Sequence, residues 1–361
     1  MSMFLRNAWY VGAWAHEVKD NVLARTMLNE PVVLFRDSAG KVRALEDRCC
    51  HRGAPLSVGE RVPEGIRCGY HSLTFNGEGI CVNIPGQTHI PDNARVKSYP
   101  VVEKDEYLWV WMGDPQKADK GLIVDYPYNN DHQNWPHGHA VLPVKGDYRL
   151  MLDNLMDLTH LGTVHKTTIG GNPVQHATAK MKTMRKPTGV KYTRWMLDSP
   201  PPPSFVKLVG FKGYIDRWQE FEYVGPTSIL QYSGAVDVGY NVYGRAHADG
   251  GPNVDMREGG IHLRLMHAVT PETDHSCLYF WTAANGHRTD DPEQTNKMMH
   301  DVTIAFDEDK AMIEHQQSRL IGFDESKLID VNSDGARLQM FRHLNQMIAE
   351  ENGQHIAAAA E

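Results

Sequence analysis

Two short segments near the N-terminus each carry one cysteine and one histidine. Cys49 and His51 form a Cys-x-His pair, and Cys68 and His71 form a Cys-x-x-His pair after sixteen intervening residues. Two sulfur and two imidazole ligands suit a zinc site, and they also suit a [2Fe–2S] cluster in which cysteines bind one iron and histidines the other. Zinc knuckles usually pair like ligands at short spacing, so the alternating order favours the cluster.

A second group of polar residues lies inside an apolar segment in the middle of the chain. Asn154, Asp157 and His160 recur every three residues, which places them on one side of a predicted helix. His165 lies five residues beyond His160, and Gly162 between them could let the helix widen or break so that both imidazoles meet one metal ion. The alternative is a pair of buried histidines with ordinary hydrogen-bond partners.

A late predicted helix offers a carboxylate to accompany these histidines. Two histidines and one carboxylate bind non-haem Fe(II) and leave coordination positions open. Asp309 lies on the apolar stripe of the helix, three residues after Phe306 and three before Met312, whereas Asp307 and Glu308 are expected to point away. A buried carboxylate must be paired or bind a metal. We predict Asp309 as the third ligand, and an ion pair with a nearby Arg or Lys is the alternative.

These residues must be held by the elements around them. Residues 1–113 read as short strands joined by turns and predict an all-β domain. Residues 114–146 are rich in Pro, Asn, Asp and His, and we interpret them as a linker. Residues 147–361 mix both types and predict an α+β domain. Its expected helices are 148 to about 160, 292–320 and 336–350, and its expected strands include 216–224, 261–269 and 277–284.

Several segments are expected to have no chemical role. We predict surface loops at 199–204 and 248–260 and a frayed tail at 357–360. Cys50 and Cys81 are interpreted as packing residues or buried thiols.

Composition excludes several classes of protein. The chain has 361 residues, which suggests about two domains, and 37 basic against 45 acidic residues give a net charge of −8. With no basic stripe, no nucleic-acid partner is expected. Five cysteines argue against a secreted disulfide framework. No apolar run approaches the ~18 residues of a membrane-spanning helix. We expect a cytoplasmic protein that does not enter a membrane.

At the level of whole motifs, the sequence resembles the oxygenase components of Rieske non-haem iron aromatic oxygenases, and within them the methyl monooxygenases and O-demethylases. The resemblance covers nearly the full length. It is carried by the two metal motifs and by the segments Arg6–Val11, Ala54–Leu56, Ile84–Gln87, Asp153–His160 and Thr270–Thr273.

The resemblance implies a fold and a set of site residues. It implies an N-terminal all-β Rieske [2Fe–2S] domain followed by a helix-grip catalytic domain, an antiparallel sheet with helices. The implied cluster ligands are Cys49, His51, Cys68 and His71, and the implied ligands of a mononuclear non-haem Fe(II) are His160, His165 and Asp309.

Four further expectations accompany the resemblance. Asp157 and Asn154 are expected in the catalytic machinery, Asp157 as an orienting partner of His160 and as a bridge to His71 of a neighbouring subunit in a homotrimer. His267 is expected near the substrate, where charge-assisted hydrogen bonds would hold an anionic group. Members of the family usually have glycine where this chain has Ser72. A serine there could form a hydrogen bond near the cluster, and we expect this to shift the reduction potential of the cluster.

The expected function is that of a terminal oxygenase of a Rieske monooxygenase. It would use O2 to hydroxylate the methyl or O-methyl group of a small aromatic acid. No G-x-G-x-x-G motif follows any predicted strand, so electrons are expected from NAD(P)H through a separate reductase that carries a flavin and a ferredoxin-type cluster. The alternatives are a Rieske electron-transfer protein without oxygenase activity, a zinc-binding interaction protein, and an oxygenase that dihydroxylates an aromatic ring.

Overall fold

The computed structural model describes residues 4–20, 22–243 and 260–353 of the chain. The chain divides into two compact units: residues 1–125 with 270–274, and residues 126–269 with 275–361. The division therefore lies inside the segment that the sequence suggested as a linker. The tail predicted at 357–360 lies outside the described residues, and so does the loop predicted at 248–260, except for Gly260.

The first unit is all-β, as predicted. Its described residues form three antiparallel sheets, in the strand orders β1-β11-β10, β2-β3-β4-β9 and β5-β6-β7-β8. Its strands are β1 (Trp9–Trp14), β2 (Leu23–Met27), β3 (Glu30–Arg36), β4 (Val42–Glu46), β5 (Glu60–Val62), β6 (Gly65–Arg67), β7 (Thr74–Phe75), β8 (Cys81–Asn83), β9 (Ser98–Tyr99), β10 (Val101–Lys104) and β11 (Tyr107–Trp111).

The second unit is built on one seven-stranded sheet with the order β12-β18-β17-β16-β15-β14-β13. Its strands are β12 (His137–Val144), β13 (Lys180–Lys186), β14 (Gly189–Ser199), β15 (Ile215–Tyr223), β16 (Ser228–Asp237), β17 (Gly260–Thr273) and β18 (Ser276–Asn285). β12 was assigned to the linker from its composition, and that assignment is wrong. It pairs with β18 at the edge of the sheet, where a strand tolerates a proline such as Pro143.

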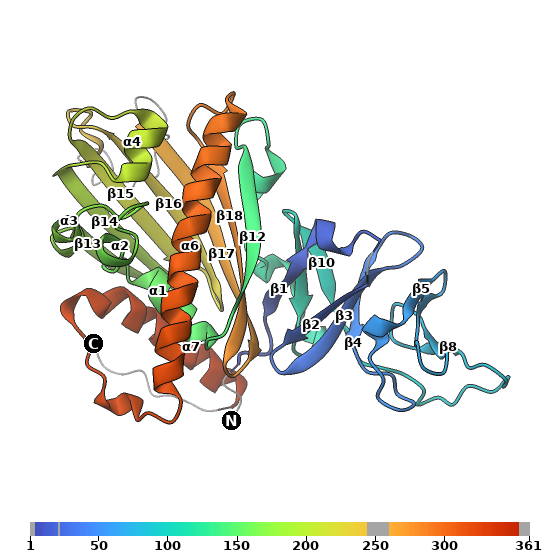
Figure 1. Ribbon diagram of the computed structural model, residues 1–361. Coiled ribbons are helices and arrows are strands. Elements are labelled where there is room, and N and C mark those ends of the chain that lie inside the picture. The colour runs from blue at the N-terminus through green and yellow to red at the C-terminus, as the bar shows by residue number, and fades with distance from the viewer. Residues whose placement is uncertain (1–3, 21, 244–259, 354–361) are drawn as a thin grey trace. The chain divides into compact units, whose positions relative to one another are not determined.

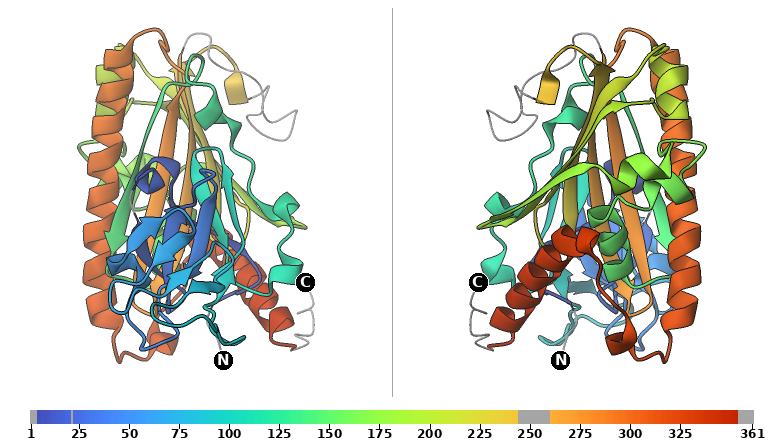
Figure 2. Two further views of the ribbon diagram at one scale, coloured as in Figure 1. Left: turned by 90° about the vertical axis from the view of Figure 1, so that its right-hand side faces the viewer. Right: turned by 90° about the vertical axis from the view of Figure 1, so that its left-hand side faces the viewer.

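Helices pack on this sheet (Figure 1). They are α1 (Tyr148–Met156), α2 (Leu161–Val164), α3 (Pro173–Ala177), α4 (Pro203–Val209), α6 (Pro292–Leu320) and α7 (Gly335–Glu351). The long helix α6 begins with the capping residue Asp291, which accepts a hydrogen bond from the Glu293 amide, and its bounds are those predicted. Figure 2 shows α6 along one side of the sheet. None of the described helices is long and apolar enough to cross a membrane.

Two segments differ from the prediction in ways that shape the site. The first predicted helix ends at Met156, four residues early, because the Asp157 carboxylate accepts hydrogen bonds from the amide and hydroxyl of Thr159 and holds an extended backbone there. The predicted surface loop at 199–204 is also wrong, since Pro203 begins α4 and Ser204 is buried.

The two faces of the sheet have different characters. On β15, Trp218 belongs to a buried aromatic cluster with Trp195 and Tyr232. Arg217 and Gln219 alternate with Trp218 and line a cavity on the other face, together with residues of α1 and α6. Since successive side chains of a strand point to opposite faces, the sheet separates an aromatic core from a partly polar cavity.

Candidate metal centres and active site

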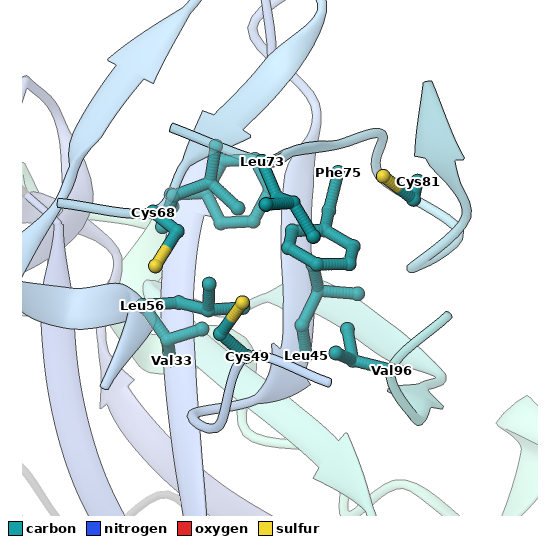
Figure 3. Packing of buried hydrophobic residues seen from close by; sticks show 11 residues of the cluster. Val33, Leu45, Cys49, Leu56, Cys68, Leu73, Phe75, Cys81 and Val96 are labelled. Carbon is teal, nitrogen blue, oxygen red and sulfur yellow. The ribbon is translucent and has the colours of Figure 1, made fainter. Parts of the chain in front are cut away.

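The first candidate centre lies at two loops of the first unit. One follows β4 and contains Cys49 and His51, and the other joins β6 to β7 and contains Cys68 and His71. Both cysteines are buried, at 3% and 2% exposure, in a core that consists mainly of aliphatic side chains with Phe35 and Phe75. Figure 3 shows their two sulfur atoms directed toward the space between the loops, whereas Cys81 lies apart. The rings of His51 and His71 lie 4.6 Å apart between centroids.

The backbones of the two loops are closed in the same way. The Cys49 amide donates to Ala54 O and the Gly53 amide donates to Cys49 O; the Cys68 amide likewise donates to Leu73 O and the Ser72 amide to Cys68 O. The fourth residue after each cysteine has a left-handed backbone, with φ of 72° at Gly53 and 60° at Ser72. Ser72 therefore occupies a position that favours glycine.

The buried sulfur atoms need a positive partner to ionise. Burial, with a further contribution from the neighbouring Cys68, raises the pKa of the Cys49 thiol to about 11. A bound iron would stabilise the thiolate form. Two adjacent buried sulfurs and two adjacent exposed imidazoles fit the donor set of a Rieske cluster. Cys50 is exposed, so its interpretation as a buried thiol is wrong, while Cys81 is buried as expected.

The second candidate centre lies in the second unit and brings three predicted residues together. Asp309 Oδ1 lies 3.3 Å from His160 Nε2 and 3.1 Å from His165 Nε2. Asp309 and His165 are buried, and the three ligand atoms lie within 4.8 Å of one another. This donor set fits a two-histidine, one-carboxylate iron site.

The turn between α1 and α2 positions the two histidines. His160 immediately precedes α2 and His165 immediately follows it, so the chain breaks before His160 and not at Gly162 as expected. Gly162 has another role, because a Cβ atom at this position would lie 2.4 Å from the Cα atom of Pro173. A side chain larger than hydrogen would push α3 away from α2.

Each of the two candidate ligand histidines has a partner for its second ring nitrogen. His160 Nδ1 lies 2.7 Å from the backbone oxygen of Asp157, so this carbonyl, and not the expected carboxylate on a shared helical face, orients the ring. His165 Nδ1 lies 2.8 Å from Glu308 Oε2. Glu308 was expected to point away, and that expectation is wrong because its longer side chain reaches His165. Such partners fix the tautomer in which Nε2 is free to bind a metal.

Asn154 completes the surroundings of the carboxylate. Its Nδ2 donates to Asp309 Oδ1 at 2.9 Å and lies 3.5 Å from His160 Nε2. Burial alone would raise the pKa of Asp309, but hydrogen bonds from His160 and His165 outweigh it and hold that pKa well below its usual range. Asp309 is therefore a carboxylate at any physiological pH.

A cavity opens beside the three candidate ligand residues. Most of its wall is apolar and includes Leu155, Leu158, Phe205, Phe221, Leu263, Leu265, Val302 and Phe306. Its polar wall residues outside the metal site are Arg217, Gln219, Gln231, Ser233 and His267. A largely apolar cavity with a few polar groups is typical of a site for a small organic ligand.

His267 lines this cavity, but in a neutral form. Its Nδ1 lies 2.7 Å from the Tyr279 hydroxyl and its Nε2 lies 2.8 Å from Gln231 Oε1. Burial lowers its pKa to about 3. Both ring nitrogens thus already have partners, and the expected charge-assisted bond from His267 to an anion stays a prediction.

The left-handed backbone of Ser72 leads to a stability prediction. Replacing Ser72 with Gly removes a strain of ~1–2 kcal/mol, partly offset by the ~0.5–1 kcal/mol of chain entropy that glycine loses. We expect Ser72→Gly to raise the free energy of unfolding by about 1 kcal/mol, measured by urea denaturation of the iron-loaded protein. The matched variant Gly53→Ser should lower it. A lower stability of Ser72→Gly would instead mean that the hydroxyl makes a necessary contact.

The position of Asp309 leads to a prediction about metal content. Asp309→Ala should lower iron by about one atom per chain and leave the visible spectrum of the cluster unchanged, since the other ligand set is on a separate unit. Asp307 is exposed on the same helix, and Asp307→Ala is the control that should keep all its iron. Iron analysis and absorption spectra of the purified variants check this. Loss of iron in Asp307→Ala alone would contradict the assignment.

Comparison with known proteins identifies the two domains that contain the candidate centres. The model of the Rieske [2Fe-2S] domain matches residues 8–100, and the model of the vanillate O-demethylase oxygenase C-terminal domain matches residues 144–350. The chain is 37% identical over 355 residues to the iron-sulfur subunit of the toluene-4-sulfonate monooxygenase system of Comamonas testosteroni, covering 97% of this chain and 99% of that protein. It is 34% identical to a vanillate O-demethylase oxygenase subunit of a Pseudomonas strain, covering 97% and 96%.

Solved structures agree with the fold. The crystal structure of dicamba monooxygenase bound to 3,6-dichlorosalicylic acid superposes with a TM-score of 0.86 at 30% identity, over 97% of this chain and 99% of that chain. Another structure of that enzyme contains non-haem iron. The predicted architecture and the two cofactors are thereby confirmed, and the zinc alternative is excluded. The chain belongs to the family of Rieske non-haem iron oxygenase components, with a Rieske [2Fe–2S] domain followed by a catalytic domain of the vanillate O-demethylase type.

Proposed function

We propose that this oxygenase component hydroxylates the methyl or O-methyl carbon of a small aromatic acid. The observation that carries the proposal is the convergence of His160, His165 and Asp309 on one wall of a mainly apolar cavity. The names of the relatives support the substrate class, since toluene-4-sulfonate and vanillate are aromatic acids with a methyl and a methoxy group. Hydroxylation of a methoxy carbon gives a hemiacetal that releases formaldehyde, whereas hydroxylation of a methyl carbon gives an alcohol.

The residues of this chain would position the iron and the substrate and would exclude water from the cavity. When bound, the mononuclear iron supplies O2 activation and the [2Fe–2S] cluster supplies single electrons. His160, His165 and Asp309 would hold the iron and leave coordination positions open. The Asp157 carbonyl and Glu308 are partners of the Nδ1 atoms of His160 and His165, so the two Nε2 atoms remain to bind the iron. Phe221 and Phe306 offer aromatic surface to a ring and keep water out of the cavity.

A separate reductase is part of the proposal. Relatives are named as subunits or oxygenase components of larger systems, and the sequence has no dinucleotide-binding motif after a strand. We assign NAD(P)H oxidation to a partner that carries a flavin and a ferredoxin-type cluster. A cytoplasmic location is proposed with it, because all five cysteines are free of disulfides.

We also propose that the chain acts as a homotrimer in which Asp157 links the two metal centres of neighbouring subunits. His51 and His71 are exposed, as a contact with another subunit requires. The Asp157 carboxylate is half-buried beside the iron-site turn, and its two oxygens accept from Thr159. Each carboxylate oxygen has a second lone pair that could accept from a ring nitrogen of a neighbouring histidine.

Oxygen uptake tests the function. The iron-loaded protein, with a reductase and NADH, is screened against aromatic acids that carry a methyl or methoxy group. We expect at least one acid to stimulate O2 uptake with formation of one alcohol, or one formaldehyde, per O2. Cluster reduction without substrate-dependent uptake would mean an electron carrier, and a cis-diol product would mean ring dihydroxylation; either result contradicts the proposal.

The proposed bridge leads to a prediction for Asp157→Asn. The amide keeps the size of the side chain but loses the negative charge that favours an N–H donor from the neighbouring subunit. We expect normal iron and cluster content, and cluster reoxidation slowed by about 10–100-fold. Rapid mixing of the pre-reduced variant with O2 and substrate measures this rate, with Asp307→Asn as the exposed control. Reoxidation at the parental rate would leave Asp157 with a purely local role.

A further inference from the structure

One wall of the cavity carries a buried cation that has no acidic partner. Arg217 on β15 is 5% exposed and lines the same cavity as His160 and Asp309. Its Nη1 donates to Gly170 O at 3.2 Å and its Nη2 donates to Ile169 O at 2.9 Å. Its Nε has no hydrogen-bond partner, and no carboxylate of the described residues forms an ion pair with it. A guanidinium has five N–H groups, so most of its donors remain unused.

The surroundings of Arg217 add positive charge. Arg194 is fully buried and donates to Leu158 O at 2.7 Å and to His176 O at 2.6 Å, again with no carboxylate in an ion pair. Burial and the charge of Arg194 lower the pKa of Arg217 to about 9, so Arg217 is still protonated at neutral pH. Since a buried charge is costly unless it is paired, this part of the wall is complementary to an anion.

The other polar part of the wall is already satisfied. His267 forms hydrogen bonds with the Tyr279 hydroxyl and with Gln231 Oε1, and Gln231 Nε2 donates to Ser233 Oγ at 2.7 Å. These four side chains are neutral, and each has another of them as its hydrogen-bond partner. An anion placed at His267 would have to break these bonds and would gain no opposite charge in return.

The strand register shows that Arg217 and His267 lie at different positions along the sheet. Arg217 is opposite Ala235 on β16, whereas His267 is opposite Ile229, six residues away along β16. At about 3.3 Å per residue, the β16 positions opposite Arg217 and His267 are roughly 20 Å apart along the strand. Both side chains nevertheless line the cavity. One small carboxylate or sulfonate therefore binds at one of the two places and not at both.

We propose that Arg217 binds the anionic group of the substrate, a carboxylate or sulfonate on an aromatic ring, and so determines the specificity of the enzyme for acids. The proposal rests on the function proposed above and names the group that recognises its substrate class. The unused N–H groups of Arg217 form charge-assisted hydrogen bonds with two oxygens of the anion. The Phe205 ring, whose centroid lies 5.2 Å from the guanidinium carbon, holds the side chain in place.

Ligand binding without turnover tests the proposal. Equilibrium dialysis under anaerobic conditions measures the Kd of 4-methylbenzoate and of its neutral isostere 4-methylbenzamide with the iron-loaded protein. We expect the parent protein to prefer the benzoate, and Arg217→Met to weaken benzoate binding by at least about tenfold with little change for the amide. Arg217→Lys should recover part of the loss because it restores the charge. Arg185→Met, at an exposed position of β13 outside the cavity, is the control that should leave both values unchanged.

Other outcomes would overturn the proposal. Equal losses for both probes in Arg217→Met would mean that Arg217 only supports the loop at residues 169–170. A selective loss of benzoate binding in His267→Gln, with none in Arg217→Met, would place the anion at His267. Parental affinity for the benzoate no greater than for the amide would also contradict it. Failure of the proposed function is distinguishable, because it would abolish substrate-dependent O2 uptake while leaving this pattern of binding intact.

Discussion

A single buried carboxylate oxygen between two imidazoles is the constraint on which the catalytic unit depends. Asp309 Oδ1 is within 3.3 Å of the Nε2 atoms of both His160 and His165, and it also accepts from Asn154. A carboxylate this deeply buried is stable only when its charge is compensated. The compensating side chains come from segments more than 140 residues before Asp309 in the chain. The contact between Glu308 and His165 joins the same two parts of the sequence.

The break between α1 and α2 and the alternation along β15 follow from that requirement. A continuous helix through residues 154–165 would not present both histidines to one point, and the Asp157–Thr159 turn replaces it with two short helices. The sheet then forms the opposite wall, with Trp218 in an aromatic cluster behind it and Arg217 facing the cavity. The three candidate iron ligands and the buried Arg217 thus line the same cavity.

Periodicity predicted the elements whose pattern is regular, and it failed where a side chain competes with the backbone. The bounds of α6 and the burial of Asp309 followed from the apolar stripe. The end of α1 was missed, although an Asp two residues before a Thr is a recognisable turn signal. Glu308 was missed because helical periodicity ignores how far a long side chain reaches. The position of Arg217 in the cavity was not predicted, because the sequence alone does not show whether an arginine of a strand lies on the solvent-exposed or the buried face of the sheet.

The most direct test of this account is an anomalous difference map of the anaerobic, iron-loaded crystal at the iron absorption edge. The account predicts one peak between His160 Nε2, His165 Nε2 and Asp309, separate from the peaks between the Cys49 and Cys68 loops, with Glu308 still bonded to His165 Nδ1. A peak in which Glu308 or Asp157 replaces Asp309 as a ligand, or the absence of density between the two histidines in fully loaded protein, would contradict it.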